Sequence, residues 1–222
     1  MDFFDEVEAD LEFDVCGKKH TLTEIIHALE ESKDPHERTD LLHIINTGLG
    51  GPFAKYAAQA LYMVTGSRAL ERNERGYRHP MDARNKSNYV SDEMVEALHG
   101  AVQDVAAPLA RRFYRLKAAH LGMKTLKWSD RDAPMPFADT THISFDEGMA
   151  MVLEAYESLS PTLAHIIRNF VAARRIDAPA QKGKRRGAFN ETLVLPGSNP
   201  VSFTFLNYLG SSRDVMTLAH EL

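Results

Sequence analysis

The spacing of apolar residues constrains the fold of this chain more than any other feature of its sequence. Over most of residues 21–174 the apolar positions recur every three or four residues, which is the helical period. The period then changes, because "AFNETLVL" and "VSFTFLNY" are rich in β-branched and aromatic residues and flank the turn signals of "PGSNP". The pattern predicts a mainly α fold, a bundle-like array of helices, with a small β-hairpin or sheet confined to about residues 187–207.

Local capping signals predict where the helices begin. Thr21 and Glu24 are spaced as a capping box, in which each side chain accepts a hydrogen bond from the other residue's backbone. The same spacing recurs at Ser144 and Glu147. The remaining starts are predicted at Pro35, Pro52, Ser91, Ser160 and Ser211 or Ser212.

Two segments interrupt the helical pattern. Residues 75–88, "RGYRHPMDARNKSN", have no period, and their Gly, Pro and Asn residues predict an ordered loop. The helical pattern over 91–121 contains Pro108, which has no backbone N–H to donate and is therefore predicted to kink the helix.

Composition excludes several classes of protein. The 222 residues include 26 Lys and Arg against 31 Asp and Glu, so the net charge of −5 gives no electrostatic footprint for nucleic acid. The single cysteine, Cys16, excludes an internal disulfide and favours a reducing compartment. The opening "MDFFDEVEAD" is acidic where a secretory signal is basic, and no apolar run approaches the length of a membrane span. We expect a cytoplasmic protein with no nucleic-acid and no membrane partner.

One basic segment stands out against this acidic background. "KGKRRG" places four basic residues between glycines, which is compatible with a phosphate or nucleic-acid patch. It lacks both the spacing of a phosphate-binding loop and the interleaved aromatic residues of a nucleic-acid surface. We therefore interpret it as a solvated turn.

The segment "SSRDVMTLAHEL" at 211–222 carries the strongest chemical signal. His220-Glu221 opens the pattern H-E-x-x-H, in which two histidines one helical turn apart bind zinc and the glutamate polarises a water molecule. The second histidine would fall at position 224, beyond Leu222. A second pair, His36-Glu37, cannot be the motif, because Asp40 stands where the histidine is required. The dipeptide alone leaves two interpretations of His220 open, a zinc ligand and a surface histidine.

Five separated blocks of the chain resemble one enzyme family. Read in order, they are similar to the oligoendopeptidase F family of zinc metallopeptidases, relatives of thimet oligopeptidase. The blocks are "YRHPMDARNKSN" (77–88), "RRFYRLKAAHLGMKTLKWSDRDAPMP" (111–136), "SFDEGMAMVLEAYESLSP" (144–161), "KGKRRGAF" (182–189) and "FLNYLGSSRDVMTLAHEL" (205–222).

The resemblance implies roles for two residues. His220 matches the first zinc ligand of the family and Glu221 its general base. In the family "AHEL" continues into Gly-His, and a further glutamate ligand follows on another helix, so the remaining ligands have no counterpart in this sequence. We expect Zn²⁺ to be the cofactor of the complete enzyme and not to be held tightly by this chain. Residues 1–180 are then a helical region and 181–222 the start of the catalytic region, together forming one unit.

The resemblance also implies a substrate site. The strand around Gly187, Ala188 and Phe189 is expected to lie along the cleft, where a short peptide adds as a further strand through backbone hydrogen bonds. Ordinary strand packing is the competing interpretation of the Phe189 side chain. The predicted function is that of a fragment of a zinc-dependent oligoendopeptidase, which hydrolyses internal bonds of short peptides and is inactive as this chain alone. The alternative is a non-catalytic helical remnant or interaction module.

Overall fold

The structure, a computed structural model, describes residues 2–138, 141–194 and 196–222 and is mainly α, as predicted. The α-helices are α1 (Asp2–Ala9), α2 (Leu22–Glu31), α3 (Pro35–Gly50), α4 (Phe53–Arg75), α5 (Asp82–Ser87), α6 (Asp92–Ala101), α7 (Ala107–His120), α8 (Phe145–Leu159), α9 (Pro161–Ala172) and α10 (Ser212–Glu221). Two short helical segments are η1 (Val102–Ala106) and η2 (Trp128–Asp130). The strands are β1 (Glu12–Val15), β2 (Lys18–Thr21), β3 (Ile176–Pro179), β4 (Phe189–Leu193) and β5 (Val201–Tyr208). Within the described part, no helix combines the length and apolar character that a bilayer span requires.

The capping signals are confirmed. The Thr21 hydroxyl accepts the Glu24 N–H at 3.2 Å, and the Glu24 carboxylate accepts the Thr21 N–H at 2.7 Å. Ser144 and Glu147 make the same reciprocal pair at the start of α8. Each cap satisfies backbone N–H groups that have no partner inside the helix, which fixes the helix start locally.

The predicted β-hairpin is confirmed, but strand structure is not confined to residues 187–207. In the three-stranded sheet the order is β3-β5-β4, with β4 antiparallel and β3 parallel to β5. A second hairpin, β1–β2, lies near the N-terminus. Strands β1 and β3 have four residues each, which is too few for a two-residue period to stand out in the sequence. Strand β1 pairs with β2 across a short turn, whereas β3 pairs with the distant strand β5.

The two predicted interruptions differ from expectation in form. Residues 82–87 of the predicted loop form the short helix α5, whose buried Asp82 accepts hydrogen bonds from the Arg78 N–H and the Lys86 ammonium. The interruption at Pro108 takes the form of the π-helical segment η1 immediately before it, where the Ala107 N–H donates to the Val102 carbonyl. The wider turn accommodates a proline that offers no N–H to the preceding turn.

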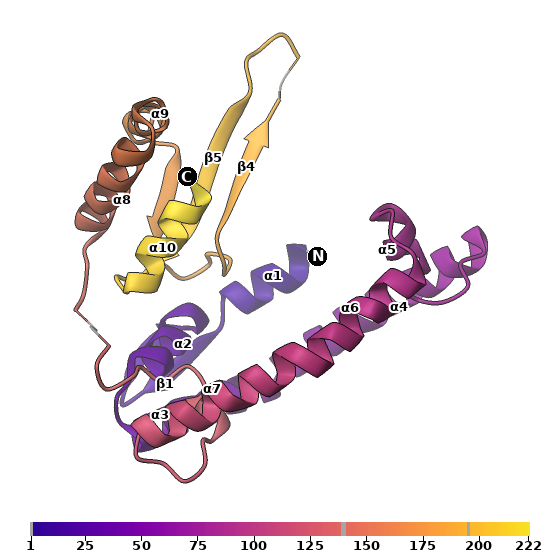
Figure 1. Cartoon of the computed structure of the whole chain (residues 1–222), viewed down its shortest axis with the longest axis horizontal. Coiled ribbons are helices and arrows are strands. Elements are labelled where there is room, and N and C mark those ends of the chain that lie inside the picture. The colour runs from indigo at the N-terminus through magenta and orange to yellow at the C-terminus, as the bar shows by residue number, and fades with distance from the viewer. Residues whose placement is uncertain (1, 139–140, 195) are drawn as a thin grey trace.

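Among the residues that the structure describes, buried hydrophobic side chains form two clusters. The first joins β1, α2 and α3 through Phe13, Leu22, Ile25, Leu41 and Ile45. The second joins α8, α9, β3, β5 and α10 through Met149, Val152, Ile167, Ala178, Leu206 and Leu218. Figure 1 shows the second group as a layer of helices beside the three-stranded sheet, while α4 and α6–α7 extend away as long helices on the other side of the molecule.

Candidate functional site

Helix α10 carries the two residues that the sequence singles out. Ser211 caps it, with its hydroxyl accepting the Asp214 N–H at 3.2 Å. The Asp214 carboxylate in turn accepts the backbone N–H groups of Ser211 at 2.9 Å and Leu209 at 3.2 Å. This network ties the end of β5 to the start of α10, so the strand determines where the helix begins.

The far end of α10 presents His220 and Glu221 on its last turn. Leu218 is fully buried, and Ala219 and Leu222 pack against the same cluster. The Tyr156 hydroxyl on α8 donates to the Ala219 carbonyl at 2.8 Å. His220 is exposed and Glu221 is half-buried, so both remain open to a ligand while their neighbours anchor the helix.

A close approach between α8 and the end of β5 sets the position of α10. A side chain at Gly148 would place its Cβ 2.5 Å from the Tyr208 hydroxyl and 3.2 Å from a Val215 methyl group. That hydroxyl lies 3.1 Å from the Ile143 carbonyl and 3.2 Å from the Ser144 carbonyl, to which it donates. Burial, reinforced by the charges of Asp214 and Glu147, raises the pKa of Tyr208, which keeps the hydroxyl protonated as a donor.

The three predicted substrate-binding residues lie where the chain enters β4. Gly187 has a φ of +91°, a conformation that favours glycine. Ala188 packs against the cluster that also holds Ala219 and Leu222, so one core brings the strand entry and the end of α10 together. Phe189 is 37% exposed, and its ring stacks on Phe205 with centroids 4.8 Å apart, which accords with the strand-packing interpretation.

Strand β4 is an open edge of the sheet. It pairs with β5 on one side, all five of its residues are exposed, and no strand in the described residues pairs with its other side. The Asn207 side chain on β5 donates to the carbonyls of Arg185 and Gly187, both at 2.9 Å, which fixes the backbone where it enters β4. Sequence analysis did not single out Asn207 or Tyr156.

The basic segment is more than a solvated turn. Lys184 is buried, and its ammonium donates to the Asp177 carboxylate at 2.9 Å and to the Pro179 carbonyl at 2.8 Å. The other three basic side chains form ion pairs with acidic residues of the N-terminal segment. These pairs are Arg185–Asp5, Arg186–Glu8 and Lys182–Glu12.

His220 suits zinc as a donor, but the described residues offer it no companion ligands. An imidazole nitrogen is a common zinc ligand, and a catalytic zinc site takes three protein ligands. Among residues 2–138, 141–194 and 196–222, no three His, Cys, Asp or Glu residues are close enough to hold one metal ion. The other His-Glu pair lies at the start of α3, where the Glu37 carboxylate accepts the Ser32 hydroxyl at 2.6 Å.

Two curated bacterial peptidases are similar to this chain in sequence. Group B oligopeptidase PepB of Streptococcus agalactiae serotype III (strain NEM316) is 27% identical over 136 residues, which are 61% of this chain and 22% of PepB. Oligopeptidase PepF of Bacillus subtilis (strain 168) is 23% identical over 145 residues, which are 65% of this chain and 21% of PepF. The matched segment therefore spans about a fifth of each relative. No protein-family model matches the chain.

Solved structures share the fold. A protein of Bacillus anthracis strain Ames named as an oligoendopeptidase F matches with a TM-score of 0.85 and 20% identity, over 99% of this chain and 40% of that protein. PZ peptidase A, solved with an inhibitor, matches with a TM-score of 0.86 and 21% identity, over 99% of this chain and 39% of that protein. The chain is therefore similar in sequence to two oligopeptidases and shares the fold of proteins named as oligoendopeptidase F, of whose length it spans about two fifths.

Proposed function

We propose that this chain is part of a zinc-dependent oligoendopeptidase that hydrolyses internal bonds of short peptides. One observation carries the proposal. The exposed His220 and the half-buried Glu221 lie on the last turn of α10, which is anchored to a sheet with an open edge, in a chain similar to two oligopeptidases. Residues 181–222, which contain the edge strand and α10, would be the start of the catalytic region.

Each of the two residues has a distinct proposed role. His220 would supply one imidazole ligand, and the other ligands would come from polypeptide outside this chain. Zinc, when bound, would polarise the scissile carbonyl and lower the pKa of the attacking water. Glu221, one residue further along the helix, would accept the proton of that water as it attacks and later pass it to the leaving amine.

The open edge of β4 supports a backbone-directed mode of peptide binding. An extended peptide laid beside Gly187–Phe189 would donate to and accept from the unpaired side of the strand. Because the Phe189 ring already stacks on Phe205, its side chain leaves the outer edge of the strand free. Recognition through backbone groups suits short peptides of varied sequence. The single exposed cysteine, Cys16, supports a reducing, cytoplasmic setting for this activity.

The proposal can be tested in a chimeric protein in which this chain replaces its equivalent segment in Bacillus subtilis PepF. The chimera should retain about one zinc per molecule after dialysis and cleave a quenched-fluorescent peptide. His220→Ala should lose the zinc, because the site is left with two ligands. His36→Ala, which changes the exposed histidine of the other His-Glu pair, should not. A folded chimera that binds no zinc, or whose zinc survives His220→Ala, would favour the non-catalytic alternative.

A further inference from the structure

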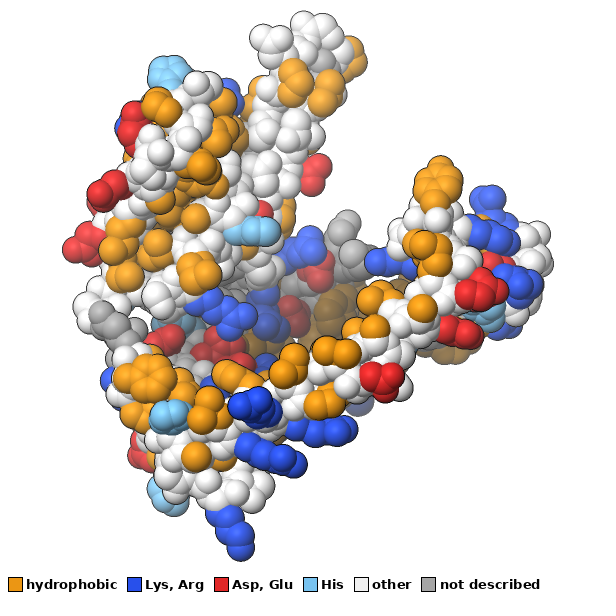
Figure 2. Space-filling model, in the orientation of Figure 1, with side chains coloured by type: hydrophobic (Ala, Val, Ile, Leu, Met, Phe, Trp, Pro, Cys, Tyr) orange, Lys and Arg blue, Asp and Glu red, His pale blue; other side chains and the backbone are white. Residues whose placement is uncertain are grey.

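An apolar stripe runs along α6, η1 and α7 without a partner in this chain. From Met94 to Leu116, successive members of the stripe are four, four, three, four, four and three positions apart. These spacings place the side chains on one face of a helix. Their exposed fractions all lie between 50% and 63%. The stripe consists of Met94, Leu98, Val102, Val105, Leu109, Phe113 and Leu116. Figure 2 shows it as a line of hydrophobic side chains along the extended helix.

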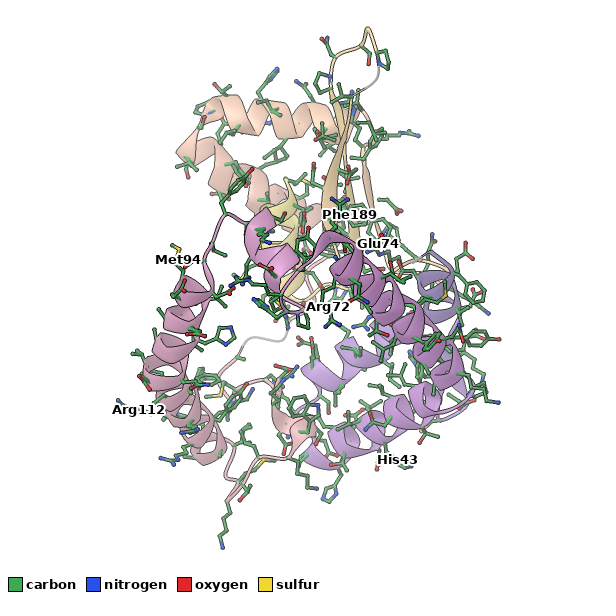
Figure 3. The ribbon with its side chains drawn as sticks, turned by 90° about the vertical axis from the view of Figure 1, so that its right-hand side faces the viewer. His43, Arg72, Glu74, Met94, Arg112 and Phe189 are labelled. Carbon is green, nitrogen blue, oxygen red and sulfur yellow. The ribbon has the colours of Figure 1, made fainter. Side chains whose placement is uncertain are left out.

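The middle of helix α4 is apolar on every side. Leu61, Tyr62, Met63 and Val64 are consecutive, so they point in all directions around the helix, and they are between 54% and 73% exposed. In the described structure Phe53 is the one buried residue of this 23-residue helix. A helical turn that is apolar on all sides is typical of the interior of a larger protein. Figure 3 shows α4, with Arg72 and Glu74, as a rod separate from the helix that carries Met94 and Arg112.

The shared fold indicates what covers these surfaces. The relatives have the fold of this chain over 99% of its length, yet the chain spans only 39–40% of theirs. The other three fifths of such a protein are available to pack on this unit, and apolar surface is where packing is favourable. A second copy of the chain is a poorer occupant, because a two-fold dimer buries one self-complementary patch and would leave one of the two separate rods uncovered.

We propose that the stripe on α6–α7 and the exposed apolar residues of α4 are both docking surfaces for the remainder of an oligoendopeptidase F, the part of such a protein that this chain does not span. The stripe extends over 23 residues, or about 33 Å at the α-helical rise, which matches a long helix or several shorter elements of the partner. The proposal rests on the fold and the exposed surfaces and does not depend on the zinc chemistry proposed for His220 and Glu221.

Thiol labelling of single-cysteine variants tests the stripe as a docking surface, with Cys16→Ser as the background. Leu98→Cys and Leu109→Cys should react rapidly in the 222-residue chain and at least about tenfold more slowly in the PepF chimera, where the remainder covers them. Arg111→Cys, exposed on the same helix but outside the stripe, should react rapidly in both proteins. Ala164→Cys, at a fully buried position of α9, should be protected in both and reports that each protein is folded.

Two results would overturn the proposal. One is equal, rapid labelling of the Leu98 and Leu109 positions in the chimera while Ala164→Cys remains protected. The other is protection of both positions in the 222-residue chain together with a doubled mass in solution, which would assign the stripe to a second copy. Zinc content and peptide cleavage of the chimera are read separately, so failure of the docking proposal is distinguishable from failure of the peptidase proposal.

Discussion

The hydroxyl of Tyr156 donates a hydrogen bond to the carbonyl oxygen of Ala219 over 2.8 Å, joining α8 to the last turn of α10. That carbonyl belongs to the residue immediately before His220, in a turn whose carbonyls have no partner further along the helix. The contact therefore supports the part of the helix that presents His220 and Glu221.

Removal of this hydroxyl should loosen the end of α10. A side-chain hydrogen bond contributes about 1 kcal/mol, so Tyr156→Phe should speed hydrogen exchange at the amides of residues 219–222 about fivefold. Tyr62→Phe, which removes a hydroxyl from a side chain that is 73% exposed, is the control and should change nothing in α10. Unchanged exchange at residues 219–222 in Tyr156→Phe would show that apolar packing alone holds the turn.

The close contact at Gly148 should make this position intolerant of a methyl group. Gly148→Ala forces the new Cβ against the Tyr208 hydroxyl and Val215, and such overpacking typically costs about 1–3 kcal/mol of unfolding free energy. Gly66→Ala in α4 adds the same methyl group where nothing lies within 4 Å, and it should stabilise the chain by up to about 1 kcal/mol. Urea unfolding of both variants measures the difference. A Gly148→Ala protein as stable as the parent would contradict the packing described for α8, α10 and β5.

The elements that sequence analysis located are those fixed by neighbours in the chain. The caps at Thr21 and Ser144 depend on a residue three positions away, so their spacing is visible in the sequence. Sequence analysis did not predict hairpin β1–β2, although Gly17, with a φ of +85°, lies at its turn. Phe13 is the one buried residue of strand β1, so the strand shows no alternation of apolar and polar residues. Strand β3 exists through pairing with β5, about 28 residues away, which no local pattern reveals.

The same distinction applies to the candidate site. His220, Glu221 and the entry to β4 were located through short motifs and the family resemblance. Asn207 and Tyr156 contribute through contacts with residues at least 20 and 63 positions away, and neither stands in a recognisable local pattern. A polar residue at the end of a strand and a tyrosine in a helix are too common to indicate such roles.

The buried ion pair between α3 and η2 should be sensitive to loss of one partner. Arg38 donates to the Asp130 carboxylate at 2.8 Å, and both side chains are at most 2% exposed. Arg38→Met would leave the Asp130 charge buried and unpaired, at a cost of about 3–5 kcal/mol in unfolding free energy. Arg68→Met breaks the exposed pair with Glu71 and should cost less than about 1 kcal/mol. Similar urea midpoints for the two variants would contradict this difference.

The attachment of α1 should weaken with salt. Arg185–Asp5 and Arg186–Glu8 are partly exposed ion pairs with N–O distances of 3.7 and 3.8 Å. The Debye screening length falls to about 3 Å at 1 M salt, so the attraction within such pairs is weakened there. Hydrogen exchange in α1 should therefore be faster at 1 M than at 0.1 M NaCl, and Glu8→Lys should reproduce the effect at low salt. Exchange in α8 serves as the internal control. If α1 exchange is independent of salt, the packing of Phe4 against Phe53 rather than charge holds the helix.

The central claim, that Glu221 is the general base of a peptidase, is tested most directly by Glu221→Gln in the chimera with PepF. Because the amide cannot accept the proton of the attacking water, kcat for a quenched-fluorescent peptide should fall by about 10²–10⁴ while zinc content stays unchanged. Glu37→Gln, the same change in the other His-Glu pair, should leave kcat unaltered. Peptide cleavage that survives Glu221→Gln at the rate of the unsubstituted chimera would contradict the role assigned to Glu221.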